Sequence, residues 1–387
     1  MGSKAGGCMS FYRDTYLEIN LNAVRNNLSH LLSILPVGIR VMAVVKADSY
    51  GHGAVMIARE LFDCGIRHFA VATLDEAIEL RNNGLREADI LIFGVVDPEN
   101  LLLCQLHGLT VSVNSLAWLK KACERNHYGP LACHLKIDSG MGRLGVTSPE
   151  EVQEALRIIR TDPHFLLRGI YSHLATAEEA DESFYETQIR RFASMIAGVD
   201  LTGLAVHVAN SAGSLKTPPP FVNMVRVGLF LNGHSPFPGP ELPFPIQPSL
   251  SLYSRFSQIK EVPAGTPIGY NRTYTTPKPA VIGTLPVGYA DGYDRRLKGG
   301  RVWADGSFHN VVGRVCMDMT MVELDHPVPE GTLVELIGPH IALEAYCGWV
   351  GTNNYHATCA FSDRLPRVYI RDGNVVQTVN KRIHNQI

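Results

Sequence analysis

Between residues 38 and 235 the sequence repeats one theme: a short apolar run, a polar turn and a stretch with helical periodicity. Residues 74–84 and 149–160, for example, carry apolar side chains three to four positions apart, which is typical of amphipathic helices. Apolar strands alternating with such helices predict parallel strands covered by helices. Eight such units favour an α/β fold with an N-terminal (β/α)8 TIM-like barrel. The apolar runs cover residues 41–47, 68–73, 89–94, 109–113, 132–138, 167–175, 205–210 and 223–231.

A doubly wound open sheet is the competing arrangement, because the same alternation of strands and helices also produces it. A dinucleotide-binding sheet of that kind carries a Gly-x-Gly-x-x-Gly loop directly after a strand. None of the eight apolar runs leads into such a loop. The sequence therefore favours the barrel, which we place within residues 18–245.

A second domain follows a proline-rich stretch at residues 234–248. Residues 250–380 show short runs of alternating apolar and polar side chains, punctuated by Gly and Pro, which indicates antiparallel strands. We therefore expect a C-terminal, mainly antiparallel β domain over residues 246–387. Residues 16–20 also have the pattern of a strand, and an N-terminal strand, placed at residues 12–17 in this division, can join the second domain.

The composition excludes several classes of function. A formal net charge of −2, with both signs spread along the chain, gives no reason to expect nucleic-acid binding. No uninterrupted apolar run approaches the ~18–20 residues of a membrane span, and residues 1–8 lack the apolar centre of a signal peptide. The eight cysteines form no C-x-x-C pair, which favours reduced thiols over disulfides or a zinc site. We therefore predict a cytoplasmic protein with no metal and no membrane or nucleic-acid partner.

Polar side chains gather near the carboxyl ends of the predicted barrel strands, where barrels of this type place their active sites. A buried cation in a strand is costly unless it is paired or binds a ligand. Any one of these residues could form a structural ion pair, but their shared position favours a functional site. The residues are Lys46, Lys136, Asp138, His173, His207, Asn210 and Arg226.

Lys46 ends the first predicted strand, in the segment VVKADSYGHG (44–53). Burial or neighbouring cations lower the pKa of such an amine, which allows it to attach to an aldehyde cofactor. This segment resembles the cofactor-lysine motif of bacterial alanine racemases. The similarity continues in order through HLKIDSGMGRLGV (134–146), YSHLATAEEAD (171–181), VHVANSAGSL (206–215), NMVRVGLFLNG (223–233), IGYNRTYT (268–275), LPVGYADGYDRRL (285–297), VGRVCMDMTMV (312–322) and TNNYHATC (352–359).

The resemblance implies an isomerase that depends on pyridoxal 5′-phosphate and interconverts L-alanine and D-alanine, supplying D-alanine for peptidoglycan. It also implies a head-to-tail homodimer whose active sites are shared between subunits. Racemisation needs one acid/base on each face of the substrate Cα, because a single base tends to return its proton to the same side. By resemblance, Lys46 and Tyr270 are these two bases, and Lys46 also carries the cofactor.

Further residues match positions that hold the cofactor in the family. Arg226 would face the pyridine nitrogen without giving up a proton, and His173 and His207 would hydrogen-bond this region together. Asn210 would support the loop that binds the phosphate. By resemblance, the phosphate ligands themselves are Tyr50, Ser211, the backbone at Gly228 and Leu229, and Tyr355.

The resemblance also implies residues on the substrate side. Arg143 would contact the substrate carboxylate. Lys136 matches a lysine that is carbamylated in many family members, which would let it accept hydrogen bonds from Arg143; the alternative is an unmodified Lys136 paired with Asp138. In the second domain, Met317 would offer its amide to the carboxylate, with Cys316 and Asp318 beside it and Tyr289 at the entrance.

The chain departs from the family pattern at Ser139, where Thr is usual, at Asn271, where Gly is usual, and at Asn232, where Tyr is usual. A site shaped for a methyl group discriminates weakly against an added hydroxyl, so a serine or broader-specificity racemase is the first alternative. A barrel-type pyridoxal-phosphate decarboxylase would carry a Gly-rich loop late in the barrel, and that run is missing. A single-barrel cofactor-binding protein would not need the second domain.

Overall fold

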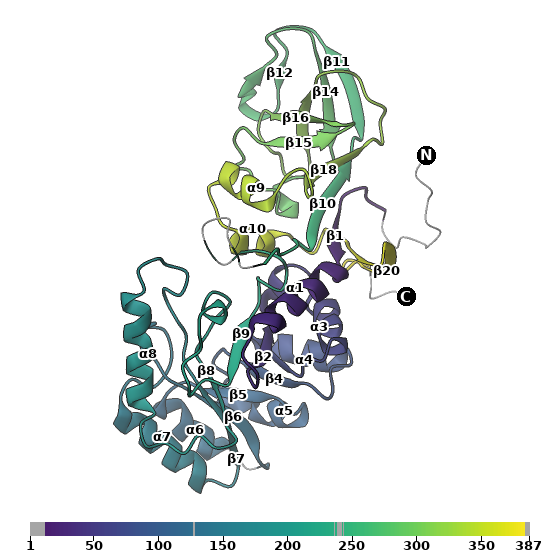
Figure 1. Cartoon of the computed structure of the whole chain (residues 1–387). Coiled ribbons are helices and arrows are strands. Elements are labelled where there is room, and N and C mark those ends of the chain that lie inside the picture. Colours follow the sequence, from purple (N-terminus) through teal and green to yellow (C-terminus); the bar gives the residue numbers. More distant parts are fainter. Residues whose placement is uncertain (1–11, 127, 236, 238–241, 243, 384–387) are drawn as a thin grey trace. The chain divides into compact units, whose positions relative to one another are not determined.

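The structure is a computed structural model that describes residues 12–126, 128–235, 237, 242 and 244–383. The chain divides into two compact units. The barrel unit comprises Val24–Tyr50 and Ala54–Ile246, and the β unit comprises the residues up to Ala23, Gly51–Gly53 and the residues from Gln247 onward. Residues 1–8, on which the expectation of no signal peptide rested, lie outside the described residues. Figure 1 shows both units with their elements labelled.

The barrel unit contains eight parallel strands in the order β8-β7-β6-β5-β4-β3-β2-β9. The two outer strands of this order approach each other, because Asn223 N donates to Val206 O over 3.1 Å and Arg226 N donates to Ala209 O over 3.1 Å. The sheet is therefore a nearly closed barrel, as predicted. The strands are β2 (Arg40–Val44), β3 (His68–Val71), β4 (Asp89–Ile92), β5 (Thr110–Val113), β6 (Leu131–Lys136), β7 (Phe165–Tyr171), β8 (Ala205–His207) and β9 (Met224–Val227).

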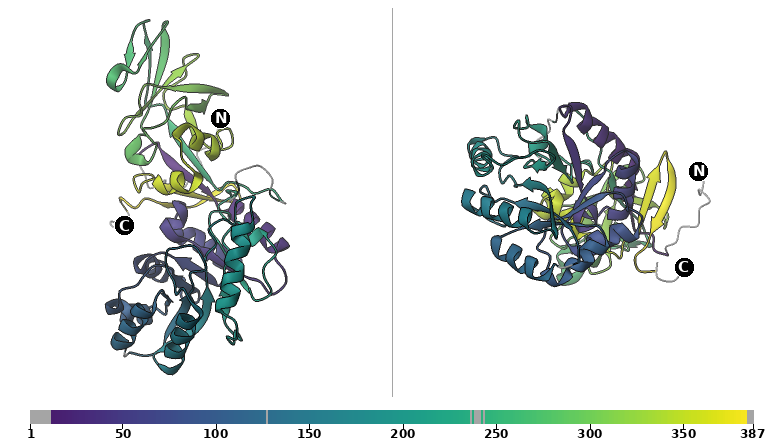
Figure 2. Two further views of the ribbon diagram at one scale, coloured as in Figure 1. Left: turned by 90° about the vertical axis from the view of Figure 1, so that its left-hand side faces the viewer. Right: turned by 90° about the horizontal axis from the view of Figure 1, so that it is seen from below.

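Helices surround these strands, as the right-hand view of Figure 2 shows. The two helices named from periodicity are α4 (Leu74–Asn82) and α7 (Pro149–Thr161), and the side chains of Thr73 and Ser148 cap their first turns. No helix of the described residues is long and apolar enough to cross a membrane. The other helical segments are α1 (Leu21–Ile34), α2 (Lys46–Tyr50), α3 (Ala54–Asp63), η1 (Pro98–Asn100), α5 (Leu101–Leu106), α6 (Leu116–Arg125), α8 (Ser183–Met195) and η2 (Gly213–Leu215).

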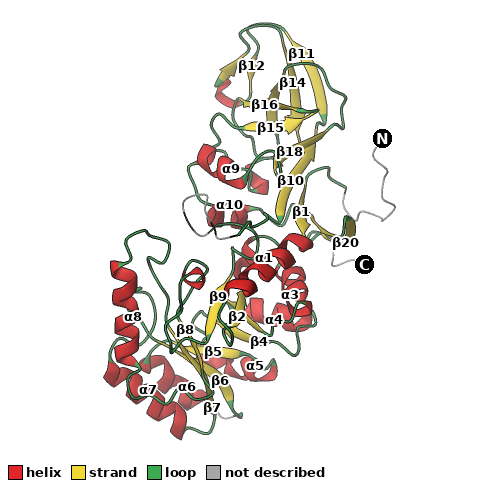
Figure 3. Cartoon of the chain, viewed as in Figure 1, coloured by secondary structure: helices red, strands yellow, loops and turns green. Residues whose placement is uncertain are grey.

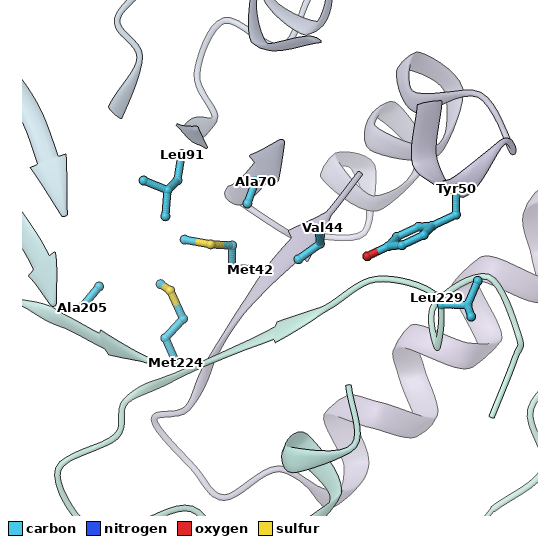
Figure 4. Packing of buried hydrophobic residues seen from close by; sticks show 8 residues of the cluster. All are labelled: Met42, Val44, Tyr50, Ala70, Leu91, Ala205, Met224 and Leu229. Carbon is cyan, nitrogen blue, oxygen red and sulfur yellow. The ribbon is translucent and has the colours of Figure 1, made fainter. Parts of the chain in front are cut away.

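Side chains fill part of the barrel interior between β2, β3, β4 and β9. Figure 4 shows Met42, Met224 and Leu91 close together, with Val44 and Tyr50 further along β2 and the turn that follows it. All five are buried. The interior is therefore a packed core at this level, as expected for a barrel of eight strands.

The β unit is built around a ten-stranded sheet of order β11-β14-β17-β16-β15-β18-β10-β1-β19-β20. Only β1 and β19 pair in parallel among the described strands of this sheet. Figure 3 shows how strands predominate here. The strands are β1 (Tyr16–Asn20), β10 (Leu250–Arg255), β11 (Gln258–Val262), β14 (Ala280–Leu285), β15 (Arg301–Ala304), β16 (Ser307–Val312), β17 (Thr320–Leu324), β18 (Leu333–Ile337), β19 (Arg367–Arg371) and β20 (Asn374–Val379), and a separate hairpin joins β12 (Pro267–Ile268) to β13 (Tyr274–Thr275).

The N-terminal strand begins at Tyr16, later than the predicted range of residues 12–17. β1 covers Tyr16–Asn20 and lies between β10 and β19, as an interior strand of the large sheet. Leu17 and Ile19 are fully buried, whereas the preceding Tyr12 is exposed. The strand itself is Tyr16–Asn20, the range that the pattern of residues 16–20 indicated. The helical segments of this unit are η3 (Tyr270–Arg272), η4 (Tyr289–Asp291), α9 (Leu343–Val350) and α10 (Asn354–Ala360).

Candidate active site

Lys46 opens a turn of left-handed helix just beyond β2. Residues 47–50 all have φ near +50°, in the left-handed region, which costs about 1–2 kcal/mol per residue for L-amino acids. Contacts from distant segments hold this conformation. Glu76 accepts a hydrogen bond from Ala47 N over 2.7 Å, and Asn232 Nδ2 donates to Ser49 O over 3.1 Å. Lys46 is therefore fixed at the carboxyl end of the barrel by backbone that the rest of the barrel unit holds in place.

Arg226 on β9 is the most extensively bonded side chain of the site. Its Nη1 donates to Nδ1 and the carbonyl of His207 over 2.8 and 2.9 Å. Its Nη2 donates to the carbonyls of Ser172 and Val208 over 2.8 and 3.1 Å, and to Nδ1 of His173 over 3.0 Å. No hydrogen bond within the described part of the chain uses Nε. The guanidinium is thus buried and anchored, and one N–H remains to bind a ligand.

The three cationic side chains named on other strands or loops also lie around His173. Burial, followed by the charges of Arg226, Lys136, Arg143 and Lys46, lowers the pKa of His173 to about 2. The imidazole is therefore neutral at physiological pH, and its Nδ1 is free to accept from Arg226. The charges of Lys46, Lys136, Arg143 and Arg226 thus all act on His173, and Arg226 contacts it directly.

Lys136, at the end of β6, lies 4.8 Å from the centre of the Tyr171 ring and is buried. Burial, with a further contribution from Arg226, lowers its pKa well below the ordinary value. No ion pair joins Lys136 to Asp138 among the described residues. The Asp138 carboxylate instead accepts from the backbone N–H groups of residues 140–143 over 2.8–3.1 Å. The structure thus shows the Asp138 carboxylate bound by loop amides, with no direct ion pair to Lys136 among the described residues.

A small polar cradle lies between β8 and the turn after β9. Gly228 N donates to Ser211 Oγ over 3.3 Å, and a Cβ at Gly228 would lie 2.3 Å from the hydroxyl of Tyr50. Leu229 is buried, and its backbone N–H donates no hydrogen bond to another described residue. Asn210 Oδ1 accepts from Gly213 N over 2.9 Å and shapes the adjoining loop. The hydroxyls of Tyr50 and Ser211, the Leu229 N–H and the close approach that Gly228 permits suit a bound phosphate.

The β unit carries a second group of predicted site residues. Tyr289 N and Ala290 N each donate, over 3.0 Å, to the carbonyls of Cys316 and Met317 respectively. Asp318 forms an ion pair with Arg364 over 2.7 Å. Met317 is 53% exposed, and its backbone N–H donates no hydrogen bond to another described residue. This loop therefore presents a free N–H, which fits the predicted contact with a carboxylate.

Tyr270 is 65% exposed and follows Gly269, whose backbone lies beside that of Arg314. Asn271, the next residue, has φ +60°. Asn tolerates this left-handed conformation better than most residues, so it can stand where the family usually has Gly. Tyr355 lies on α10 and is also exposed.

Sequence reasoning missed several residues that shape the barrel site. Tyr171 stacks on the His207 ring at 4.8 Å and 15°, and its hydroxyl lies 2.7 Å from Ser112 Oγ. His134 Nδ1 lies 2.9 Å from His207 Nε2. Tyr171 begins the segment YSHLA and His134 begins HLKID. Both lie in apolar runs, where an aromatic ring is usually an ordinary core side chain.

The comparisons with known proteins agree over the whole chain. Residues 19–236 match the family described as "Alanine racemase, N-terminal domain", and residues 249–369 match "Alanine racemase, C-terminal domain". Alanine racemase 1 of Bacillus subtilis is 40% identical over 376 residues, 96% of each chain. The crystal structure of alanine racemase from Bacillus anthracis with bound L-Ala-P has a TM-score of 0.91 at 37% identity, and covers 97% of this chain and 100% of its own.

A racemase of a different amino acid is more distant in sequence. Histidine racemase from Leuconostoc mesenteroides has a TM-score of 0.87 at 26% identity, and covers 94% of this chain and 100% of its own. The fold is thus shared with a racemase of another amino acid, whereas the higher identities belong to alanine racemases. Both domain matches, the full-length identity and the barrel site place the chain in one family. The chain belongs to the alanine racemase family.

Proposed function

We propose that this chain is an isomerase that interconverts L-alanine and D-alanine and so supplies D-alanine for peptidoglycan. The observation that carries the proposal is the arrangement around Arg226, with Lys46, Lys136 and Arg143 near the same imidazole, in a member of this family. A serine or broader-specificity racemase is the second candidate. It is favoured by Asn232, which donates to the Ser49 carbonyl beneath the lysine turn, where the family usually has Tyr.

Alanine racemases use pyridoxal 5′-phosphate, and the barrel site suits it. The phosphate would bind the cradle of Tyr50, Ser211 and the amides of Gly228 and Leu229, with Tyr355 as a further ligand. Nε of Arg226 would donate to the pyridine nitrogen, and Lys46 would hold the cofactor covalently. When bound, the cofactor withdraws electrons from the substrate and makes its Cα–H acidic.

Arg226 limits which reaction follows. Burial, the larger effect, lowers its pKa to about 10, so the guanidinium still keeps its proton at neutral pH. A donor that does not release its proton leaves the pyridine nitrogen largely unprotonated. This weakens electron withdrawal and favours exchange of the Cα proton over transamination or decarboxylation.

Lys46 Nζ and Tyr270 Oη would be the two bases, one on each face of Cα. Arg143 and the Met317 amide would bind the substrate carboxylate, with Cys316 and Asp318 supporting that loop and Tyr289 at the entrance. Tyr270, Met317 and Tyr289 are at least partly exposed in the single chain. This exposure supports a head-to-tail homodimer in which each site takes Tyr270 from the partner. We place the enzyme in the cytoplasm, where its reduced thiols would persist.

The function is tested by racemisation assays with alanine and serine as separate substrates. We expect L-alanine and D-alanine to be interconverted at high kcat/KM. Serine should follow at a ratio corresponding to about 1–3 kcal/mol, because an added hydroxyl is weakly rejected. A kcat/KM for serine above that for alanine would support the second candidate. Carbon dioxide release from either substrate, without racemisation, would contradict both.

Attachment of the cofactor is tested without turnover. We expect the purified protein to be yellow and to lose this colour on borohydride reduction. Peptide mapping should then place the pyridoxyl group on Lys46, since its amine starts the turn beside the phosphate cradle. The Lys46→Arg protein serves as control and should take up no label. Label on Lys136 would show that the wrong lysine had been assigned.

Lys136 is the lysine we propose to carry a carbamate. A neutral amine attacks carbon dioxide and releases one proton, and the buried Lys136 meets that condition. The product anion would accept hydrogen bonds from Arg143. Protein equilibrated with 13C-bicarbonate should show a carbamate 13C resonance that Lys136→Ala abolishes and Lys298→Ala retains. A resonance that survives Lys136→Ala would assign it elsewhere.

A further inference from the structure

Arg226, His207 and His134 form a continuous line of hydrogen bonds through the barrel. Arg226 Nη1 lies 2.8 Å from His207 Nδ1, and His207 Nε2 lies 2.9 Å from His134 Nδ1. A guanidinium can only donate, so His207 Nδ1 must accept. His207 therefore carries its proton on Nε2 and donates it to His134, which must carry its own proton on Nε2. The three groups thus have one consistent set of proton positions.

The two imidazoles are neutral and held in place. Burial is the main cause that lowers the pKa of His134 to about 3 and that of His207 far below its usual value. His207 also stacks on Tyr171. Gly169 leaves room for His134, because a Cβ there would lie 2.7 Å from His134 Cε1. A buried imidazole that cannot move aside is a rigid acceptor.

The other side of His134 faces the opposite end of the barrel. It lines a cavity of about 390 Å³ at the amino ends of the strands, together with Arg40, His68, Asp89 and Arg168. His68 and Asp89 pair over 2.9 Å. None of these four side chains shares a hydrogen bond with His134 among the described residues. Within this part of the chain, His207 is the hydrogen-bond partner of the His134 ring.

We propose that His134 is a positioning residue: by accepting from His207, it holds the imidazole against which Arg226 is anchored. Without this acceptor, the buried Nε2–H of His207 would be unsatisfied, and a buried unsatisfied donor is costly. The ring would then turn or shift toward a carbonyl and take one anchor of the guanidinium with it. The kinetic consequence rests on the proposed racemase function, whereas the proton positions do not.

The direct test is 15N NMR of the cofactor-free protein with labelled histidine. Wild type should show His207 as the Nε2–H tautomer with a downfield, slowly exchanging proton. His134→Leu should lose that downfield proton, and His134→Asn, whose Oδ1 lies where Nδ1 was, should keep it. His68→Leu removes another imidazole from the same cavity and should leave the His207 signals unchanged. An unaltered His207 proton in His134→Leu overturns the proposal.

The second measurement uses the loaded enzyme. His134→Leu should lower kcat for alanine about tenfold, with a smaller change in KM, and raise the fraction of turnovers in which the amino group passes to the cofactor and pyruvate leaves. His134→Asn should restore both values. A folded His134→Asn that matches His134→Leu in both measurements overturns the proposal. If the wild type does not racemise alanine, the proposed function fails, and the NMR result still decides the role of His134.

Discussion

A mixture of Lys46→Ala and Tyr270→Phe proteins should recover about a quarter of wild-type activity, although each variant alone is nearly inactive. The reason is the proposed twofold dimer, in which Lys46 of one subunit works with Tyr270 of the other. Random exchange makes about half of the molecules heterodimers, each with one site holding both native bases and one holding neither. The measurement is alanine racemisation after exchange, compared with each parent variant.

The control for this result is exchange itself, followed with two different affinity tags. The matched negative control is a mixture of the Lys46→Ala protein with the double variant Lys46→Ala,Tyr270→Phe, because no dimer in that mixture contains Lys46. Tagged heterodimers that are present but inactive would mean that both bases come from one chain. Recovery near one quarter would exclude that arrangement.

Arg226→Met should lower the free energy of unfolding of the cofactor-free protein by about 2–4 kcal/mol. Methionine fills much of the volume but donates no hydrogen bond, so buried acceptors of Ser172, His207 and Val208 lose their donor. Removing the buried charge offsets part of this loss. Urea denaturation followed by circular dichroism measures the difference.

Arg190→Met is the matched control for this measurement. Arg190 pairs with Glu186 one helical turn away on the exposed face of α8, and such pairs contribute at most about 0.5 kcal/mol. Equal losses in the two variants would show that the bonds of Arg226 add nothing to stability. An Arg226→Met protein that is as stable as wild type would also show that these bonds add nothing to stability.

The strands of the barrel were predictable because each is buried on both faces and so is apolar along its length. The runs at 89–94 and 109–113, for example, became β4 and β5. Strand ends were also informative, since Lys46, His173 and Arg226 are polar residues near the carboxyl ends of otherwise apolar runs. The N-terminal strand was displaced in the domain division because residues 12–15 lack the apolar alternation that begins with Leu17 and Ile19.

The geometry around Lys46 was not predictable from local sequence. Residues 47–50 contain no glycine, yet all four are left-handed, because Glu76 and Asn232 hold the turn from positions far along the chain. His134 was missed for a similar reason. Its role depends on a ring two strands away in the sheet, and nothing in its own apolar run distinguishes it from a core residue.

The position of Arg226 on β9 also determines the order in which the barrel can be completed. Its acceptors follow β7 and β8, which emerge earlier during synthesis on the ribosome, and β9 must pair with β2 to close the sheet. Until β9 emerges, those carbonyls and imidazoles are hydrated. Pairing β9 with β2 therefore brings the Arg226 guanidinium to these acceptors and displaces their water in one event. A nascent chain that stops short of β9 lacks the guanidinium that pairs these acceptors.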